Sequence, residues 1–297
     1  MRIVVSGASG FIGRGVSATL RREGHEVVAL TRGPARPGAI HWDPPAGVLD
    51  PAALEGFDAV VHLAGENAGA ARWTSAKKAS IRSSRTVGTT LLAGTIARLA
   101  RRPTTLVSAS GINVYGSPGD TLVDEESPLG DGFLAGVCHE WEAATAPASA
   151  AAVRVVILRI GMVLAPNGGG LGRLLPLFRL GLGGPTGSGR QWMSWVTRDD
   201  VAAAVSHAVG QRGLAGVVNL VSPNPVRNRD FVKTLGRVLH RPALLPAPAF
   251  ALRLVLGEMA DDLLLASIRV SPAALARSGF GFRDPDLEPA LRRMLAG

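Results

Sequence analysis

Short apolar runs alternate with longer amphipathic stretches along most of this chain. Runs that are apolar on both faces are typical of strands buried in a parallel sheet. The strands predicted in this way span residues 2–6, 26–30, 39–42, 57–65, 104–110, 154–159 and 217–221. Helices are predicted between them, one from Thr74, whose hydroxyl can cap it, to about Arg102, and another from Phe133 to Ala146. This alternation predicts an α/β fold built on a doubly wound parallel sheet.

A glycine motif follows the first predicted strand. The residues Gly7-Ala8-Ser9-Gly10-Phe11-Ile12-Gly13 are spaced G-x-x-G-x-x-G and lead into an amphipathic stretch that ends near Arg22. Glycines at such a turn let the backbone approach a pyrophosphate, and the free N–H groups and dipole of the helix favour its negative charge. The strand–turn–helix context therefore predicts a dinucleotide site rather than an ordinary turn.

The end of the second predicted strand indicates which dinucleotide is bound. An NAD site usually has Asp or Glu here, about 20 residues beyond the glycines, to bind the ribose 2′-hydroxyl. This chain has Thr31 and Arg32 instead. A guanidinium is suited to a 2′-phosphate, which a carboxylate would repel, so the sequence favours NADP over NAD. The alternative is a solvated arginine at a strand end.

Two segments depart from the alternating pattern. Residues 167–190 are rich in glycine around a helix-like apolar segment, and loops at the carboxyl ends of strands bind substrates in this architecture. From Pro223 onward the chain is mostly helical with frequent prolines, which predicts a small C-terminal lobe over the sheet. We expect residues 1–165 and 196–222 to form the nucleotide-binding domain, and residues 166–195 and 223–297 to form the substrate-side and C-terminal lobe.

Composition narrows the class of protein. With 297 residues, 46% hydrophobic and 19% charged, the chain is expected to be globular and to hold one large α/β domain or one domain with a smaller appendage. The single cysteine, Cys138, excludes an intrachain disulfide, and the six histidines are never paired at metal-ligand spacing. We expect no signal peptide, because Met1 runs straight into a strand, and no membrane span, so a cytoplasmic location fits best.

The formal net charge of +9 comes almost entirely from arginine. The arginines are scattered singly or in pairs, whereas a nucleic-acid binder gathers them on one face. We therefore expect a small-molecule substrate and an anionic cofactor as partners, no nucleic acid and no membrane, with a homodimer as a possible assembly.

The chain resembles the extended short-chain dehydrogenases/reductases, on Gly7 to Gly13, Leu63-Ala64-Gly65, Val114-Tyr115-Gly116 and the segment from Trp195 to Val201. It is most similar to the atypical, sugar-nucleotide-epimerase-like family. The motifs that carry this closer resemblance are His62-Leu63-Ala64-Gly65-Glu66, Arg72-Trp73, Ser108-Ala109-Ser110, residues 137–142, residues 187–195, Gly257-Glu258-Met259-Ala260 and Gly279-Phe280-Gly281-Phe282. The resemblance covers essentially the whole chain and implies a Rossmann fold with NADP(H) bound.

The acid/base pair of that superfamily is missing. Typical members use a Ser–Tyr–Lys set in which tyrosine and lysine lie four residues apart on one helix, and the lysine holds the ribose. Tyr115 is the one tyrosine of the chain, and residue 119 is glycine. In the expected helix, Glu142 suggests a register that puts Leu134 and Cys138, or Phe133 and Val137, at these positions.

Candidate site residues follow from the motif and the resemblance. Ser110 and Tyr115 are the candidate catalytic hydroxyls, although each has a structural alternative, as a turn serine and as a packed aromatic. Cys138 is interpreted as a small buried residue. The residues assigned to cofactor binding are Gly7, Ser9, Gly10, Phe11, Ile12, Gly13, Thr31, Arg32, Leu63, Ala64, Gly65, Glu66, Ser108 and Arg159.

Three functions remain open on the sequence. The first is an NADP(H)-dependent oxidoreductase or epimerase-like enzyme, with the proton moved by Ser110, Tyr115, water or the substrate itself. The second is a non-catalytic NADPH-binding or sensor protein, which the missing Tyr–Lys pair favours and the glycine-rich substrate-side loop disfavours. The third, a nucleic-acid-associated protein, rests on net charge alone.

Overall fold

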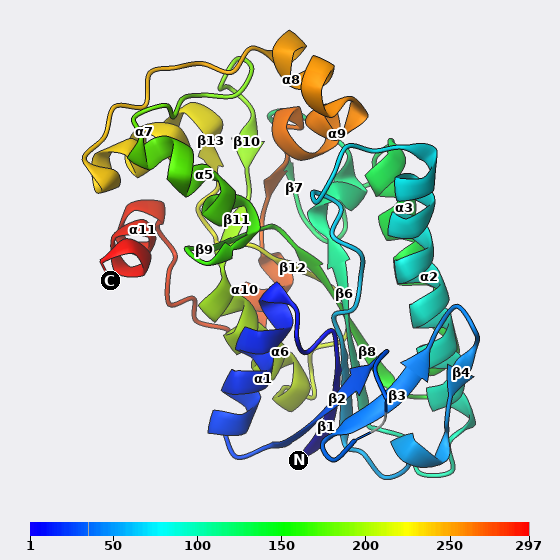
Figure 1. The fold of residues 1–297 in the computed structure, drawn as a ribbon. Helices are drawn as coiled ribbons and strands as arrows, with labels where there is room; N and C mark the ends of the chain where they lie inside the picture. The colour runs from blue at the N-terminus through cyan, green and yellow to red at the C-terminus, as the bar shows by residue number, and fades with distance from the viewer. Residues whose placement is uncertain (35, 297) are drawn as a thin grey trace.

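An eight-stranded sheet forms the centre of the computed structural model, which describes residues 1–34 and 36–296 (Figure 1). The sheet order is β12-β8-β6-β5-β1-β2-β3-β4, and every neighbouring pair is parallel except β3 and β4. Its strands are β1 (Arg2–Ser6), β2 (Glu26–Thr31), β3 (Ala39–Asp43), β4 (Val48–Leu49), β5 (Ala59–His62), β6 (Thr105–Gly111), β8 (Arg154–Ile160) and β12 (Gly216–Leu220). The doubly wound Rossmann-type sheet predicted from the sequence is therefore confirmed.

Helices cover both faces of this sheet because its strands are apolar on both sides. Ile3 and Val5 belong to the core under α1 (Phe11–Arg22) and α6 (Arg198–Gly210). Val4 points to the opposite core, which is covered by α2 (Ser75–Arg98) and α4 (Ala146–Ala150). The short helix α3 (Phe133–Ala143) packs against α2 (Figure 1). This layering fixes the carboxyl ends of the strands along one open edge of the sheet.

Two helix ends differ from the sequence prediction. The hydroxyl of Thr74 accepts the Lys77 N–H at 3.1 Å, as expected for the start of α2, but the helix ends at Arg98 instead of Arg102. It ends there because Leu99 takes an extended backbone, with ψ of 145°, and its side chain is buried. The helix expected over residues 133–146 is divided into α3 and α4, and Pro147 has no N–H with which to continue α3.

The C-terminal half adds a second, smaller core. Leu175 of α5 (Gly169–Arg179), Phe231 of α7 (Asn228–Leu239) and Leu291 of α11 (Leu287–Leu295) are buried together in it. The helical character expected for this region is confirmed. The helices α8 (Ala249–Leu256), α9 (Glu258–Ala260) and α10 (Ala273–Arg277) also lie in this region. Short elements that the sequence did not predict are β7 (Leu122–Val123), β9 (Met162–Ala165), β10 (Trp192–Met193), β11 (Trp195–Thr197), β13 (Val226–Arg227), β14 (Arg269–Val270), η1 (Ala52–Leu54), η2 (Ile112–Tyr115) and the π-helical η3 (Asp261–Leu265).

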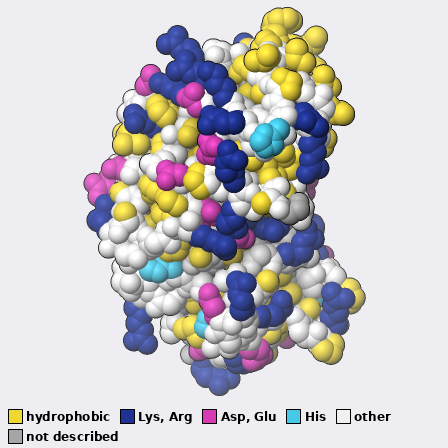
Figure 2. Space-filling model, turned by 90° about the vertical axis from the view of Figure 1, so that its left-hand side faces the viewer, with side chains coloured by type: hydrophobic (Ala, Val, Ile, Leu, Met, Phe, Trp, Pro, Cys, Tyr) yellow, Lys and Arg dark blue, Asp and Glu magenta, His cyan; other side chains and the backbone are white. Residues whose placement is uncertain are grey.

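Across residues 1–34 and 36–296, none of the helices combines the length and the apolar character needed to span a bilayer. On the face that Figure 2 presents, lysine and arginine side chains are spread between acidic and apolar ones rather than gathered into a single patch. The expectation that the chain has no nucleic-acid partner stays a prediction.

Candidate functional site

The glycine turn between β1 and α1 has the geometry of an anion cradle. Gly7 has φ of +68°, and a Cβ on Gly13 would lie only 2.0 Å from the Gly7 carbonyl oxygen, so both positions require glycine. A Cβ on Gly10, in contrast, would meet only that same oxygen, at 3.1 Å. Because Gly10 is the N-cap and no side chain caps α1, the first N–H groups of the helix remain available to a bound phosphate.

Ser6 joins the ends of the two strands at the centre of the sheet. Its Oγ accepts the backbone N–H of Leu63 at 3.1 Å and that of Ala64 at 3.2 Å. A Cβ on Gly7 would lie 2.9 Å from the Leu63 carbonyl carbon, so the turn after β1 lies directly against the turn after β5. The chain reverses its order between these strands, and ligands bind at such a switch point in open α/β sheets.

His62 lies beneath this junction and is fully buried. Its Nδ1 is 2.6 Å from Ser6 Oγ, and its Nε2 is 2.9 Å from Thr89 Oγ1. Because Ser6 Oγ already accepts two N–H groups, its own hydrogen goes to Nδ1, which assigns the proton of the neutral ring to Nε2. Burial lowers the pKa of His62 to about 4, in keeping with a ring that stays neutral.

Thr31 and Arg32 lie where the sequence predicts the adenosine end of the cofactor. Thr31 Oγ1 accepts the Gly33 N–H at 3.2 Å, which shapes the turn after β2. The Arg32 side chain is exposed, and no carboxylate of residues 1–34 and 36–296 forms an ion pair with it. His41, which sequence reasoning did not select, lies beside Thr31 on β3, and its Nδ1 is 2.8 Å from the Gly33 carbonyl oxygen.

The two serines predicted to bind the cofactor differ in exposure. Ser9 is exposed, whereas Ser108 is buried with its Oγ 3.5 Å from the Ala109 carbonyl oxygen.

Three further residues predicted to bind the cofactor contact other parts of the protein. The Phe11 ring packs against the backbone of Gly168 and Gly169. Ile12 contacts the core below α1, and the Glu66 carboxylate pairs with Lys77. Their roles toward a cofactor stay predictions.

Arg159 and Glu142 form a buried ion pair beside the end of β6. Arg159 of β8 donates from Nε and Nη2 to the two oxygens of Glu142, at 2.9 and 2.8 Å, and both side chains are less than a tenth exposed. Ser110 Oγ donates to the same carboxylate at 2.7 Å. Arg159 is therefore hydrogen-bonded to Glu142, and its contact with a cofactor stays a prediction. Glu142 was missed because its pairing depends on the packing of α3 against β8.

Tyr115 forms a hydrogen bond with the arginine of this ion pair. Its hydroxyl donates to Asn219 Oδ1 at 2.8 Å and accepts from Arg159 Nη1 at 2.9 Å, and the side chain is 3% exposed. Burial is the largest influence on its pKa, which is raised above the ordinary value of tyrosine. This arrangement favours the interpretation of Tyr115 as a packed turn aromatic, and its catalytic role stays a prediction.

Two alignments of α3 with the missing Tyr–Lys pair were considered above. In the first of them Leu134 and Cys138 stand at the tyrosine and lysine positions, and both side chains are buried. Burial raises the pKa of the Cys138 thiol to about 11, so it is protonated at neutral pH and suited to packing rather than to nucleophilic attack.

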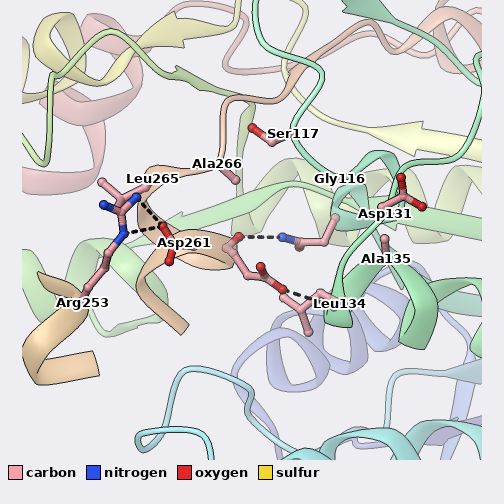
Figure 3. A pocket seen from close by; sticks show the side chains of 11 residues that line it. Gly116, Ser117, Asp131, Leu134, Ala135, Arg253, Asp261, Leu265 and Ala266 are labelled. Carbon is pink, nitrogen blue, oxygen red and sulfur yellow. Dashed lines mark hydrogen bonds and ion pairs between the residues drawn. The ribbon is translucent and has the colours of Figure 1, made fainter. Parts of the chain in front are cut away.

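A cavity of about 280 Å³ opens beside the first turn of α3 (Figure 3). Gly116, Asp131 and Leu134 line one side of it, and Arg253 and Asp261, which are paired at 2.9 Å, line the other. Asp262 joins the two sides, because its carboxylate accepts the Leu134 N–H at 3.2 Å and its carbonyl accepts Asn113 Nδ2 at 3.1 Å. Burial raises the pKa of Asp262 above its ordinary value. This carboxyl group, contributed by the C-terminal lobe, was also missed by sequence reasoning.

Comparisons with known proteins identify the family of this chain and agree with its Rossmann-type fold. The model of the NAD dependent epimerase/dehydratase family matches residues 3–220, and that of a domain of unknown function, DUF1731, matches residues 247–294. An epimerase family protein of Mycobacterium bovis, Mb2239, is 43% identical over 290 residues, covering 97% of this chain and 96% of its own.

Two solved structures are also similar. The crystal structure of human epimerase family protein SDR39U1 (isoform 2) with NADPH superposes with a TM-score of 0.91 at 34% identity, covering 100% of this chain and 99% of its own. The nucleoside-diphosphate sugar epimerase of Corynebacterium glutamicum has a TM-score of 0.82 at 36% identity, covering 99% of this chain and 58% of its own.

The neutral state of His62 predicts a pH-dependent loss of stability. Between its ordinary pKa near ~6.5 and its folded pKa of about 4, the unfolded chain binds a proton that the folded chain does not. The contribution of His62 is therefore complete above the unfolded value and decreases by about 3 kcal/mol as the pH falls through this range.

Denaturant unfolding at pH 7 and pH 4 measures this effect, with His62→Gln as the variant that cannot titrate. The unmutated protein should lose about 3 kcal/mol more free energy of unfolding than the variant between the two pH values. Equal losses in both proteins would show that the ring does not titrate in this way.

Proposed function

The chain belongs to the NAD dependent epimerase/dehydratase family, and from that premise we propose that it is an NADP(H)-dependent oxidoreductase or epimerase-like enzyme. Its substrate is a small-molecule carbonyl or alcohol. The observation that carries the proposal is the turn from Gly7 to Gly13, which leads into an uncapped helix N-terminus at the sheet's switch point.

The choice of NADP(H) is supported by the end of β2. Arg32 has no carboxylate partner in the part of the chain that the structure describes, so its guanidinium is available to a 2′-phosphate. A bound NADPH in the human relative's structure points the same way. The pyrophosphate would lie on Gly10 and the first N–H groups of α1, with the adenosine end toward Thr31.

The substrate is proposed to reach the cavity between α3 and the C-terminal lobe. The bound cofactor would supply or accept a hydride at a carbonyl-level carbon. Ser110 Oγ already donates to Glu142, so its lone pairs can accept the hydrogen of a substrate hydroxyl. In the alcohol-oxidising direction a proton would pass from the substrate to Ser110 and from Ser110 to Glu142; in reduction it would return by the same route.

A non-catalytic NADPH-binding protein is the second candidate. It is favoured by one observation, that α3 buries Leu134, Val137 and Cys138, so neither of the two registers considered above provides a tyrosine and a lysine. The enzyme is preferred because a polar cavity lies beside the same helix and because Ser110 is paired with a buried carboxylate. Absence of turnover across a panel of carbonyl compounds, together with tight NADPH binding, would favour the second candidate.

Cofactor choice is tested by Arg32→Asp. The unmutated protein should bind NADPH more tightly than NADH, and the variant should lose roughly 10- to 100-fold of NADPH affinity, because a charged phosphate contact becomes a repulsion. Titration of both cofactors measures this. Arg22→Asp, which makes the same charge change at the far end of α1, should leave the preference unchanged. Equal affinities for both cofactors in the unmutated protein would refute the assignment.

The proton route is tested by Ser110→Ala. Turnover should fall by roughly 10²–10⁴-fold, the range for a positioned proton-transfer group, while NADPH affinity stays nearly constant. Tyr115→Phe removes the hydrogen-bond partner of Arg159 Nη1 and of Asn219 Oδ1, so its main effect should be a loss of about 1–3 kcal/mol of stability. Steady-state kinetics and thermal unfolding separate the two outcomes. Full activity of Ser110→Ala would assign the proton to water or to the substrate.

A further inference from the structure

Helix α8 and the segments beside it expose a large apolar surface. None of the residues of α8 is buried, and Phe250 and Leu254 are 74% and 75% exposed. The segment after α5 runs alongside the segment before α8, because the Leu245 N–H donates to the Gly183 carbonyl oxygen at 3.1 Å. We call the region the α8 surface and define it by six side chains, each more than half exposed: Leu180, Leu182, Leu244, Phe250, Leu254 and Val255.

The α8 surface differs from ordinary exposed side chains because its members are contiguous. Single exposed hydrophobics are normal on a protein surface, whereas a contiguous apolar area marks a contact with a partner or with a membrane. Helix α8 stands at the upper end of the molecule in Figure 1, and apolar side chains gather at the same end in Figure 2. We therefore asked what chemistry surrounds this area.

Arginines border the α8 surface. Arg72 Nη1 donates to the Leu254 carbonyl oxygen at 3.2 Å, and Arg241 Nε donates to the Arg179 carbonyl oxygen at 3.0 Å, next to Leu180. All three arginines are exposed, and within residues 1–34 and 36–296 none of them forms an ion pair with a carboxylate.

The acidic side chains of the same region are already engaged. Glu258 pairs with Lys78 at 2.8 Å, Asp261 pairs with Arg253 at 2.9 Å, and Asp262 faces the cavity. The charge left around the apolar side chains is therefore positive. It favours an anionic partner and opposes a second copy of this chain, whose α8 surface would carry the same charge.

We propose that the α8 surface docks the protein on an anionic membrane, with the apolar side chains of α8 in the interface and the bordering arginines on lipid phosphates. A helix without buried residues projects from the fold, and it can enter a deformable lipid interface without needing a complementary protein surface. Arginine stems lie along apolar side chains while their guanidinium groups reach the headgroups. Such a contact needs no spanning helix, and it departs from the expectation, drawn from the sequence, that the protein has no membrane partner.

The proposal goes beyond the proposed function and does not depend on it. It does bear on how a substrate arrives, because Arg253 of α8 also lines the cavity beside α3. Docking through α8 brings that cavity close to the bilayer.

Flotation with two kinds of vesicle tests the proposal. One kind contains phosphatidylcholine alone, and the other contains equal parts of phosphatidylcholine and phosphatidylglycerol. The unmutated protein should float with the mixed vesicles and stay unbound with phosphatidylcholine alone. Added salt should weaken the binding, because the exposed charges are screened.

Two double variants separate the apolar and the charged contributions. Phe250→Ser with Leu254→Ser should weaken binding to the mixed vesicles by at least roughly tenfold, because two apolar side chains no longer enter the interface. Arg179→Glu with Arg241→Glu should weaken it by roughly 10- to 100-fold, because two attractions to lipid phosphate become repulsions.

Matched controls make the same changes elsewhere on the surface. Val48 lies on β4, and Val87 precedes a glycine that lies against Trp42 of β3, so Val48→Ser with Val87→Ser removes exposed apolar side chains far from α8. Arg22→Glu with Arg102→Glu changes the net charge by the same amount at the ends of α1 and α2. Both control variants should bind the mixed vesicles as the unmutated protein does.

Several results would overturn the proposal. These are an unmutated protein that does not float with the mixed vesicles, equal binding to both kinds of vesicle, and equal losses in the α8 variants and their controls. A lipid-free dimer that Phe250→Ser with Leu254→Ser converts to a monomer, without vesicle binding, would assign the α8 surface to a second copy instead. Thermal unfolding checks that the variants fold; should the α8 double variant not fold, Leu244→Ser, 80% exposed and outside any helix, is judged by the same flotation.

Discussion

The hydroxyl of Ser6 holds together the two strand ends on which the cofactor edge depends. It accepts the N–H groups of Leu63 and Ala64 and donates to His62, so one buried oxygen fixes the turns after β1 and β5 and the tautomer of the ring beneath them. The close approach of Gly7 to Leu63 is possible only because Gly7 has no side chain and takes a positive φ. The glycine turn and the start of α1 are positioned by this junction.

The charged side chains near the cofactor edge differ from those of a superfamily member with a Tyr–Lys pair. The buried ion pair, Arg159 with Glu142, is satisfied within the protein and orients Ser110. Arg32, at the end of β2, is exposed and has no carboxylate partner among the described residues. A 2′-phosphate would complement this charge.

Most of the sheet, the glycine turn and the start of α2 could be predicted from the sequence, because each is encoded by a short stretch of consecutive residues. The strands of the parallel sheet are continuous apolar runs, the cradle is a glycine spacing, and Thr74 caps α2 as its position suggests. Glu142 could not be found in this way. It lies on α3, and its burial and its partner arise from packing against another element, because Arg159 belongs to β8. Arg159 was assigned to cofactor binding, and its pairing with Glu142 could not be predicted because the two residues lie on different elements.

A crystal structure of the protein with NADPH tests the central claim most directly, because it shows which residues contact the pyrophosphate and the 2′-phosphate. We predict the pyrophosphate over Gly10 and the 2′-phosphate beside Arg32. A cofactor bound in the opposite direction, or away from the turn between β1 and α1, would contradict it.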